Sequence, residues 1–166
     1  LLFFVCGADK TKAYMKELAE RGEYQIGEEE LARIKNDFAG FSCSDGEGAA
    51  AIGKLFKDAG YLMDTHTAIA WAASDKYLKA AGNAGCKNVV LSTASPYKFT
   101  GAVLAALGEK ASGDDREDMK LLSKVSGTEI PGSLSSIFDK EIKHKDIIDV
   151  EEMKSVVVQY AGKGRV

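Results

Sequence analysis

The feature that most constrains the fold is a charge-poor stretch, residues 61–107, between two heavily charged flanks. It holds four of the chain's 22 Lys and Arg residues and two of its 25 Asp and Glu residues. Burying a charge is costly, and a chain of 166 residues is long enough to form a real core. We therefore predict three segments, in which residues 61–107 are the buried centre between residues 1–60 and residues 108–166.

The centre follows the pattern helix, strand, helix. "DTHTAIAWAASDKYLKAAG" (64–82) is apolar nearly all round from Ala68 to Ala73, which predicts a buried helix that begins at Asp64 or Thr65. "CKNVVLST" (86–93) has the β-branched content of a strand, and "KFTGAVLAALG" (98–108) predicts a second helix. This order is typical of a parallel sheet covered by helices. The predicted fold class is α/β, a helix-rich segment with part of a parallel sheet.

The flanks are predicted to be mainly helical. Apolar spacing and terminal Gly residues favour helices in residues 9–22, 27–38, 48–60 and 114–127. Beyond them, Pro131 favours a helix start, "DIIDV" (146–150) favours a short strand, and residues 150–162 favour a final helix or mixed element. The acidic runs are read as solvated helix faces.

Composition excludes several function classes. A net charge of −3 gives no electrostatic case for nucleic acid or a membrane surface as a partner. No apolar run reaches the length of a membrane-spanning helix. Cys6, Cys43 and Cys86 are odd in number and far apart, with only His66 and His144 as histidines. We therefore expect no structural metal site, no disulfide framework and a reducing, cytoplasmic location.

The beginning of the chain, "LLFFVCG", is apolar and lacks the basic region of a signal peptide. Such a run suits a buried helix end or strand. It also suits a chain that begins within the core of a larger protein, which is the interpretation we favour.

Familiar catalytic motifs such as GxxxxGK[ST], GxGxxG, GxSxG and HExxH are absent. Two polar places remain. Asp64 and His66 precede the predicted buried helix, either as an N-cap and a satisfied histidine, or as an anion site at a helix N-terminus. "LSTASPYKF" (91–99) is either an ordinary polar turn or a ligand site, because ligands of parallel sheets sit beyond the strands' carboxyl ends. His144 is expected to be solvated.

Three stretches resemble, in order, the C-terminal part of bacterial-type threonine synthases. They are "GYLMDTHTAIAWA", "VVLSTASPYKFTGAVLAALG" and "EIPGSLSSIFDKEIKHKDIID". The family has an Asp-Pro-His-Thr helix start, a Ser-Thr-Ala strand end followed by Lys-Phe, and a Lys-rich tail. Thr65 departs from the family's Pro. Residues 1–60 then correspond to a helical insertion, and the fold is expected to be part of a tryptophan-synthase-like domain.

The resemblance implies a pyridoxal-phosphate enzyme that converts O-phospho-L-homoserine and water to L-threonine and phosphate, a carbon–oxygen lyase acting on a phosphate ester. It places Thr93 against the cofactor's pyridine nitrogen, where a hydroxyl is a neutral partner. It implies that Ser92, Ser95 and Lys98 line the same crevice, and that Asp64 and His66 lie near the cofactor or support its pocket.

No catalytic residue is expected in this segment, because the family's Schiff-base lysine belongs to its N-terminal part and Lys98 does not match it. The isolated segment is thus expected to be inactive, to bind no cofactor alone and to self-associate through an unpaired strand. Two alternatives stay open at this point. One is a non-catalytic relative that binds a phosphorylated ligand on the same scaffold, and the other is a helical interaction module built on residues 8–60.

Overall fold

The structure, a computed structural model, describes residues 1–82, 85, 87–143 and 145–162. These residues form two compact units, residues 1–129 and residues 130–166. These two units are defined by contacts, whereas the three segments were predicted from charge density, and that division stays a prediction. Cys86 and His144, and part of the turn expected at residues 82–85, lie outside the described residues.

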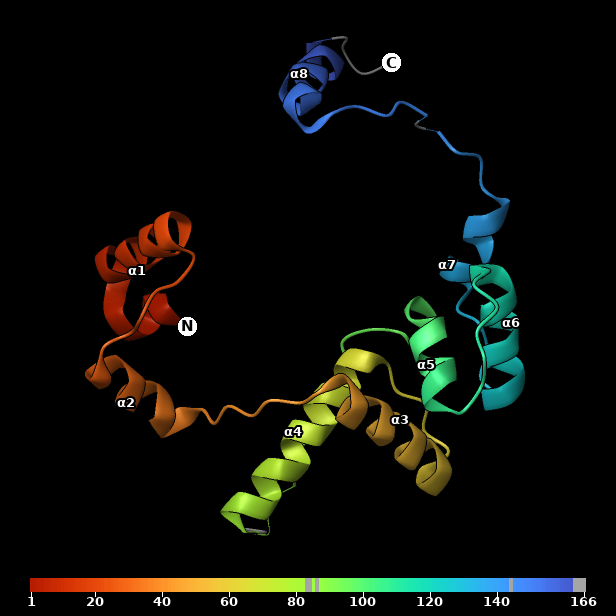
Figure 1. Ribbon diagram of the computed structural model, residues 1–166, viewed down its shortest axis with the longest axis horizontal. Helices are drawn as coiled ribbons and strands as arrows, with labels where there is room; N and C mark the ends of the chain where they lie inside the picture. The colour runs from red at the N-terminus through yellow and green to blue at the C-terminus, as the bar shows by residue number, and fades with distance from the viewer. Residues whose placement is uncertain (83–84, 86, 144, 163–166) are drawn as a thin grey trace. The chain divides into compact units, whose positions relative to one another are not determined.

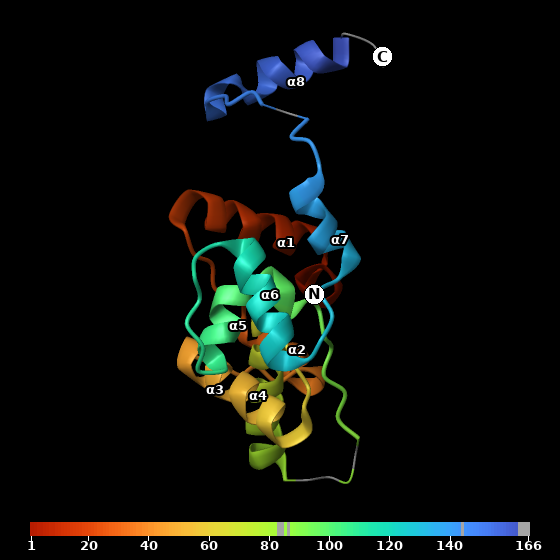
Figure 2. The same ribbon diagram turned by 90° about the vertical axis from the view of Figure 1, so that its right-hand side faces the viewer.

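The larger unit is helical (Figures 1 and 2). Its elements are α1 (Leu2–Arg21), α2 (Glu28–Asp37), α3 (Asp45–Ala59), α4 (Thr65–Ala81), the 3₁₀ turn η1 (Pro96–Lys98), α5 (Thr100–Ala106) and α6 (Asp115–Ser126). The smaller unit contains α7 (Gly132–Ser135), the 3₁₀ turns η2 (Ser136–Asp139) and η3 (Val150–Glu152), and α8 (Met153–Gly162). Among the described residues no helix is long and apolar enough to span a membrane.

Local sequence signals determine most of the helix ends. The predicted terminators Gly22, Gly60 and Gly127 all adopt the left-handed conformation, with φ of 77°, 67° and 69°. Ser44 caps α3 in a capping box with Glu47. Helix α1 begins at Leu2, but its helical backbone breaks at Gly7, where φ is 81°, so the part after the break begins close to the start expected near residue 9.

The core of the larger unit lies among α3, α4, α5 and α6. Helix α3 packs against both α4 and α5, and α5 packs against α6 (Figures 1 and 2). The fully buried side chains at its centre are Ile52 on α3, Met63 before α4, Val103 and Leu104 on α5, and Leu122 on α6. The packing joins residues 1–60 to residues 61–107, so α3 is not part of a separate helical module.

The described residues contain no strand, so the predicted parallel sheet is not seen in this chain. A strand needs a neighbour for its backbone hydrogen bonds, and no described segment forms a backbone ladder with residues 87–93. These residues instead run back along α4, because Asn88 donates to the Ser74 hydroxyl and Ser92 contacts Thr67.

The segment has the rise of an extended chain. From Ser74 back to Thr67, α4 advances seven residues, roughly 10 Å at helical rise. From Asn88 to Ser92 the other segment advances four residues, roughly 13 Å if extended. The two lengths are similar in size, so the contacts at Ser74 and Thr67 are compatible with a largely extended path for residues 88–92 beside α4.

The expectation that the centre would be fully buried was wrong for this chain. Val89 and Leu91 are 79% and 72% exposed, and Ile69 and Trp71 on α4 are also exposed. The physical reason is that α4 packs chiefly on α3, and the described residues cover its remaining apolar side chains only in part. The buried residues lie at the N-terminal end of α4. They are Met63 and Asp64, just before the helix, and Thr67 and Ala68 in its first turn.

Gly53 allows the close approach of α3 to α5 and generates a prediction about stability. A Cβ atom at Gly53 would lie 2.7 Å from the Ala106 carbonyl oxygen, which is backbone and cannot move aside cheaply. Gly53→Ala should therefore lower the free energy of unfolding, by about 1–3 kcal/mol. Urea denaturation followed by circular dichroism measures the change.

Gly48→Ala is the matched control on the same helix. Its Cβ would meet only the Ile69 side chain, at 4.0 Å, so alanine's higher helix propensity should stabilise this variant by up to about 1 kcal/mol. If Gly53→Ala were as stable as Gly48→Ala, the close packing of α3 on α5 would be contradicted.

Candidate functional site

The site is built around Asp64, the residue that caps α4. Its side chain is fully buried, at 0% exposed. One carboxylate oxygen accepts hydrogen bonds from the backbone N–H groups of His66, at 2.8 Å, and Thr67, at 3.3 Å. The other accepts from the Thr67 hydroxyl. The prediction that Asp64 begins this helix is confirmed.

Asp64 is held in its charged form. Burial raises the pKa of the Asp64 carboxyl, but the hydrogen bonds from the Thr67 hydroxyl and from the two backbone N–H groups outweigh burial and leave the pKa below its ordinary value of 3.8. A carboxylate at a helix N-terminus also interacts favourably with the helix dipole. Both carboxylate oxygens are thus engaged by groups at the start of α4.

The Thr67 hydroxyl joins the two polar motifs of the sequence. It contacts the Asp64 carboxylate on one side, and its oxygen lies 3.4 Å from the Ser92 hydroxyl oxygen on the other. Thr67 is buried, whereas Ser92 is exposed at the start of the polar loop. The start of α4 and the loop of residues 91–99 therefore meet at this contact, although they are 25 residues apart.

The same loop is held at a second point by Tyr97. The Ser95 hydroxyl accepts from the Tyr97 backbone N–H, at 3.3 Å, and so begins η1. The buried Tyr97 hydroxyl donates to the Thr128 carbonyl, at 2.8 Å, and lies 2.8 Å from the Thr128 hydroxyl. Thr128 is itself fixed by Ser126, whose hydroxyl lies 2.7 Å from that of Thr128.

His66 meets the end of the loop. Its ring lies against the Phe99 ring, with centroids 4.8 Å apart and planes tilted by 56°, and its Nδ1 is 3.4 Å from Asp64. Both rings line a largely apolar cavity of about 490 Å³ between α3, α4 and α5, with Ile52 and Ile69 among its walls. The imidazole thus lies between the buried carboxylate and an apolar hollow.

Thr93 and Lys98 are the two predicted site residues without an anchor. Both side chains are exposed, and neither makes a hydrogen bond or ion pair to another residue that the structure describes. Thr93 lies directly between Ser92, which contacts Thr67, and the turn that Ser95 caps. Its hydroxyl is therefore available to a ligand while its backbone is held on both sides.

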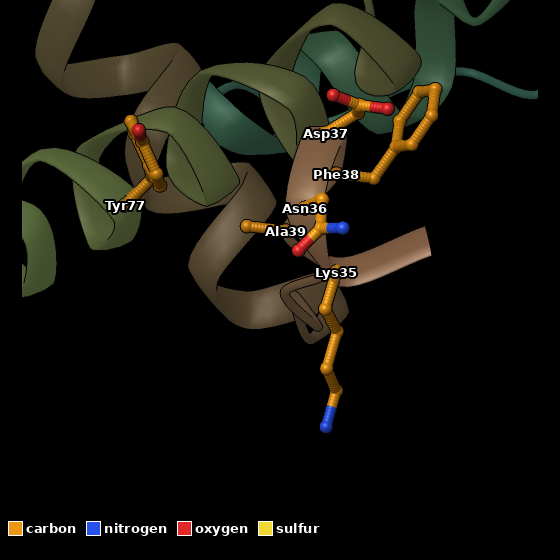
Figure 3. Close-up of a pocket in the computed structure, with 6 residues that line it drawn as sticks. All are labelled: Lys35, Asn36, Asp37, Phe38, Ala39 and Tyr77. Carbon is orange, nitrogen blue, oxygen red and sulfur yellow. The ribbon is translucent and has the colours of Figure 1, made fainter. Parts of the chain in front are cut away.

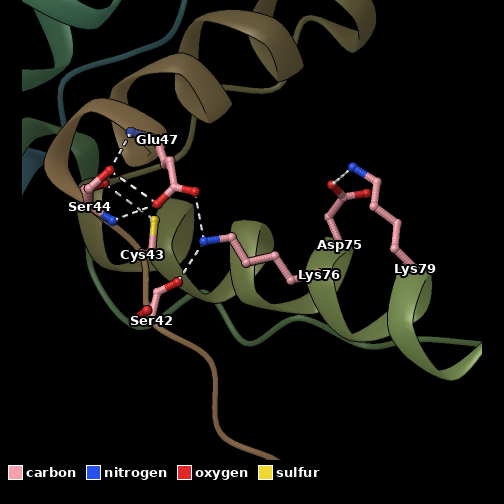
Figure 4. Close-up of polar contacts among 7 residues, drawn as sticks. All are labelled: Ser42, Cys43, Ser44, Glu47, Asp75, Lys76 and Lys79. Atoms are coloured by element: carbon pink, nitrogen blue, oxygen red, sulfur yellow. Dashed lines mark hydrogen bonds and ion pairs between the residues drawn. The ribbon is translucent and has the colours of Figure 1, made fainter.

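Other polar features of the larger unit serve the fold. A shallow cavity of about 360 Å³ lies between residues 35–39 and Tyr77 (Figure 3), away from the residues of the two motifs. Lys76 on α4 pairs with Glu47 at 2.7 Å and donates to the Ser42 carbonyl (Figure 4). Lys76, with the Ser44 hydrogen bonds, lowers the pKa of the Glu47 carboxyl to about 2. In the described ranges, no His, Cys, Asp and Glu cluster could hold a metal ion.

Comparison with known proteins identifies the family. The family model "Threonine synthase, C-terminal" matches residues 67–157, more than half of the chain. The chain belongs to the threonine synthase family. The match includes Thr67 and the whole loop of residues 91–99, while Asp64 and His66 lie just before it.

The relatives that the chain matches are longer proteins. Threonine synthase from Saccharomyces cerevisiae is 24% identical over 96% of this chain and 32% of its own length. The human protein "Threonine synthase-like 1" is 34% identical over 60% of this chain and 14% of its own length. The chain thus spans between about a seventh and a third of these relatives.

Solved structures of the family share the fold. The yeast threonine synthase structure aligns with a TM-score of 0.70, over 93% of this chain and 30% of that chain. The structure of threonine synthase with bound pyridoxal phosphate from Brucella melitensis aligns with a TM-score of 0.68, over 96% and 30%. Both are 24% identical to this chain, so this likeness concerns the fold alone.

Sequence reasoning missed two of the residues that organise this site. Thr67 and Tyr97 were not singled out, although each joins segments that are 25 or more residues apart. The available signal was a hydroxyl three residues after the Asp64 cap, a position from which a side chain can reach the capping residue. Nothing local indicated that Tyr97 would reach Thr128.

Because Asp64 is charged in the folded chain, the free energy of unfolding should fall at acidic pH. Because the folded-state pKa of Asp64 is depressed, its contribution is present above about pH 4 and is lost as the pH falls through the folded-state value. Asp64→Asn should lower the free energy of unfolding by about 1–2 kcal/mol at pH 7. The difference from the parent chain should shrink between pH 4 and pH 2, measured by urea denaturation.

Asp9→Asn, on an exposed position of α1, is the control and should change stability by less than about 0.5 kcal/mol at either pH. An Asp64→Asn penalty that stayed constant from pH 7 to pH 2 would show that the carboxylate charge has no part in holding the start of α4.

Proposed function

We propose that this chain is the C-terminal part of a threonine synthase, which converts O-phospho-L-homoserine and water to L-threonine and phosphate with pyridoxal phosphate. The observation that carries the proposal is the meeting of the two family motifs. Thr67 and His66, from the helix-start motif, contact Ser92 and Phe99, from the loop motif. A site that uses both motifs accounts for this contact.

The residues present suit the pyridine end of the cofactor. Thr93 offers an exposed neutral hydroxyl from a loop anchored on both sides, and a hydroxyl can donate to an unprotonated ring nitrogen. The nearby carboxylate, Asp64, is occupied by Thr67 and by backbone N–H groups. Pyridoxal phosphate, when bound, supplies an electron sink for the substrate's carbanion chemistry. Ser92, Ser95 and Lys98 would border the ring, and His66 would support the wall.

The predicted parallel sheet belongs to this proposal. Residues 87–93 would be a strand of the complete enzyme, with Thr93 at its carboxyl end, where ligands of α/β sheets bind. Their path beside α4 and the exposure of Val89 and Leu91 suit a strand flanked by partners that the described residues do not supply. The lysine that holds the cofactor is proposed to lie in a part of the complete enzyme that residues 1–166 do not span.

Taken alone, the chain should be inactive, bind no cofactor and self-associate in the cytoplasm or in vitro. The reason is a group of exposed apolar side chains, with Ile69 and Trp71 on α4 and Val89 and Leu91 on the segment beside it. Sedimentation velocity should show a dimer or larger species, and a clean monomer at micromolar concentration would overturn this part of the proposal.

A second candidate is a non-catalytic relative that binds a phosphorylated ligand on the same scaffold. The observation that keeps it open is that relatives 34% identical over 60% of this chain are named threonine synthase-like 1, so family membership alone does not fix the reaction. The complete protein separates the two candidates: incubation with O-phospho-L-homoserine should release phosphate and form threonine. Ligand binding without turnover would favour the second candidate.

The assigned role of Thr93 generates a prediction for the complete protein. Thr93→Val removes one hydrogen bond to the pyridine nitrogen while keeping the side-chain shape, so pyridoxal phosphate should bind about 3–10-fold more weakly. Its absorption maximum should shift and turnover should fall. Because the side chain is exposed, the unfolding midpoint should hardly change.

Thr93→Ser, which retains the hydroxyl, is the matched control and should keep most of the affinity and turnover. Cofactor spectra and turnover of Thr93→Val that equal those of the parent enzyme would refute the role of Thr93 and leave the family assignment intact.

A further inference from the structure

We infer that Thr67 is a positioning residue, whose hydroxyl transmits the fixed position of the Asp64 carboxylate to Ser92 and so holds the loop that carries Thr93. The inference rests on the proposed function for the role of Thr93 in cofactor binding. The contact between Thr67 and Ser92 is taken from the structure. Thr67 is buried, and its hydroxyl contacts both the Asp64 carboxylate and the Ser92 hydroxyl.

The chain of contacts begins at a rigid point. Asp64 is fully buried and accepts hydrogen bonds from two backbone N–H groups of its own helix, so its carboxylate cannot rotate without breaking the start of α4. The Thr67 hydroxyl is held against that carboxylate. A hydroxyl has one proton and two lone pairs, so it can serve the carboxylate and the Ser92 hydroxyl at the same time.

Thr67 provides the described side-chain link from α4 to the loop just before Thr93, and the next link on that side, between Ser74 and Asn88, lies four residues earlier. Residues 91–93 are exposed and lie outside any helix, and Ser92 makes its described side-chain contact to Thr67. Beyond Thr93, the loop is held independently by the Ser95 cap and by the contact of Tyr97 with Thr128. Loss of the Thr67 hydroxyl should therefore loosen one side of Thr93 and leave the other side fixed.

A pre-formed loop matters because ordering a flexible segment on binding weakens affinity. If Thr67 holds Ser92 before the cofactor arrives, Thr93 already occupies its binding position. Removal of the Thr67 hydroxyl then weakens cofactor binding through the position of the loop. A residue that only stabilised the fold would change the unfolding midpoint without changing the loop.

The first arm of the test uses the complete protein without its cofactor. Backbone ¹⁵N order parameters of residues 91–95 should fall from about 0.85 toward 0.6 in Thr67→Val. Ser92→Ala should produce the same loss, because it removes the other half of the contact without touching the α4 cap. Thr67→Ser, which keeps the hydroxyl, should restore the parent values.

The control variant is Thr11→Val, which removes a threonine hydroxyl that donates to the Gly7 carbonyl in α1 at 2.8 Å. It should leave the order parameters of residues 91–95 unchanged. Unchanged values in Thr67→Val would overturn the inference. A loss in Thr67→Val but not in Ser92→Ala would also overturn it, because Thr67 would then act through the helix start instead of through Ser92.

The second arm uses the complete protein and pyridoxal phosphate. Thr67→Val and Ser92→Ala should each raise the cofactor's dissociation constant about 3–10-fold, and the double variant should be no worse than either single one. Fully additive losses would overturn the inference. Failure of the parent protein to bind pyridoxal phosphate would instead refute the proposed function, while the order parameters would still decide the role of Thr67.

Discussion

The arrangement of this chain depends on one buried carboxylate at the start of α4. Asp64 accepts hydrogen bonds from two backbone N–H groups and one hydroxyl in a fully buried position. Leaving these groups unpaired would be costly, so the start of α4 has a single low-energy geometry. Thr67 and His66 are placed by that geometry, and through them Ser92 and Phe99 are placed.

The loop of residues 91–99 is consequently held by three contacts that come from distant parts of the chain. Thr67 contacts it at Ser92, Thr128 binds it at Tyr97, and His66 lies against it at Phe99. None of these contacts involves Thr93, which keeps an exposed hydroxyl in a constrained backbone. Neighbouring residues thus hold the loop, and the Thr93 side chain remains accessible. This arrangement is expected of a pre-organised ligand site.

Local features of the fold were predictable from sequence, and non-local ones were not. Glycines that adopt positive φ at Gly22, Gly60 and Gly127 ended helices as expected, and Asp64 capped α4. The burial of α4 and of residues 87–93 was predicted wrongly because apolar content reports what a segment can bury. It does not report whether this chain supplies the neighbour. The contact between Thr67 and Ser92 could not be predicted from spacing, since it depends on how α4 and the returning segment lie together.

The central claim is that the Thr93 hydroxyl is placed to meet the pyridine nitrogen of pyridoxal phosphate. A crystal structure of the complete protein with the cofactor bound is the most direct measurement. The account predicts that the Thr93 Oγ1 lies about 2.7–3.2 Å from the ring nitrogen, with Thr67 still in contact with Ser92. A ring nitrogen that is hydrogen-bonded to another residue, with Thr93 turned away from the cofactor, would contradict it.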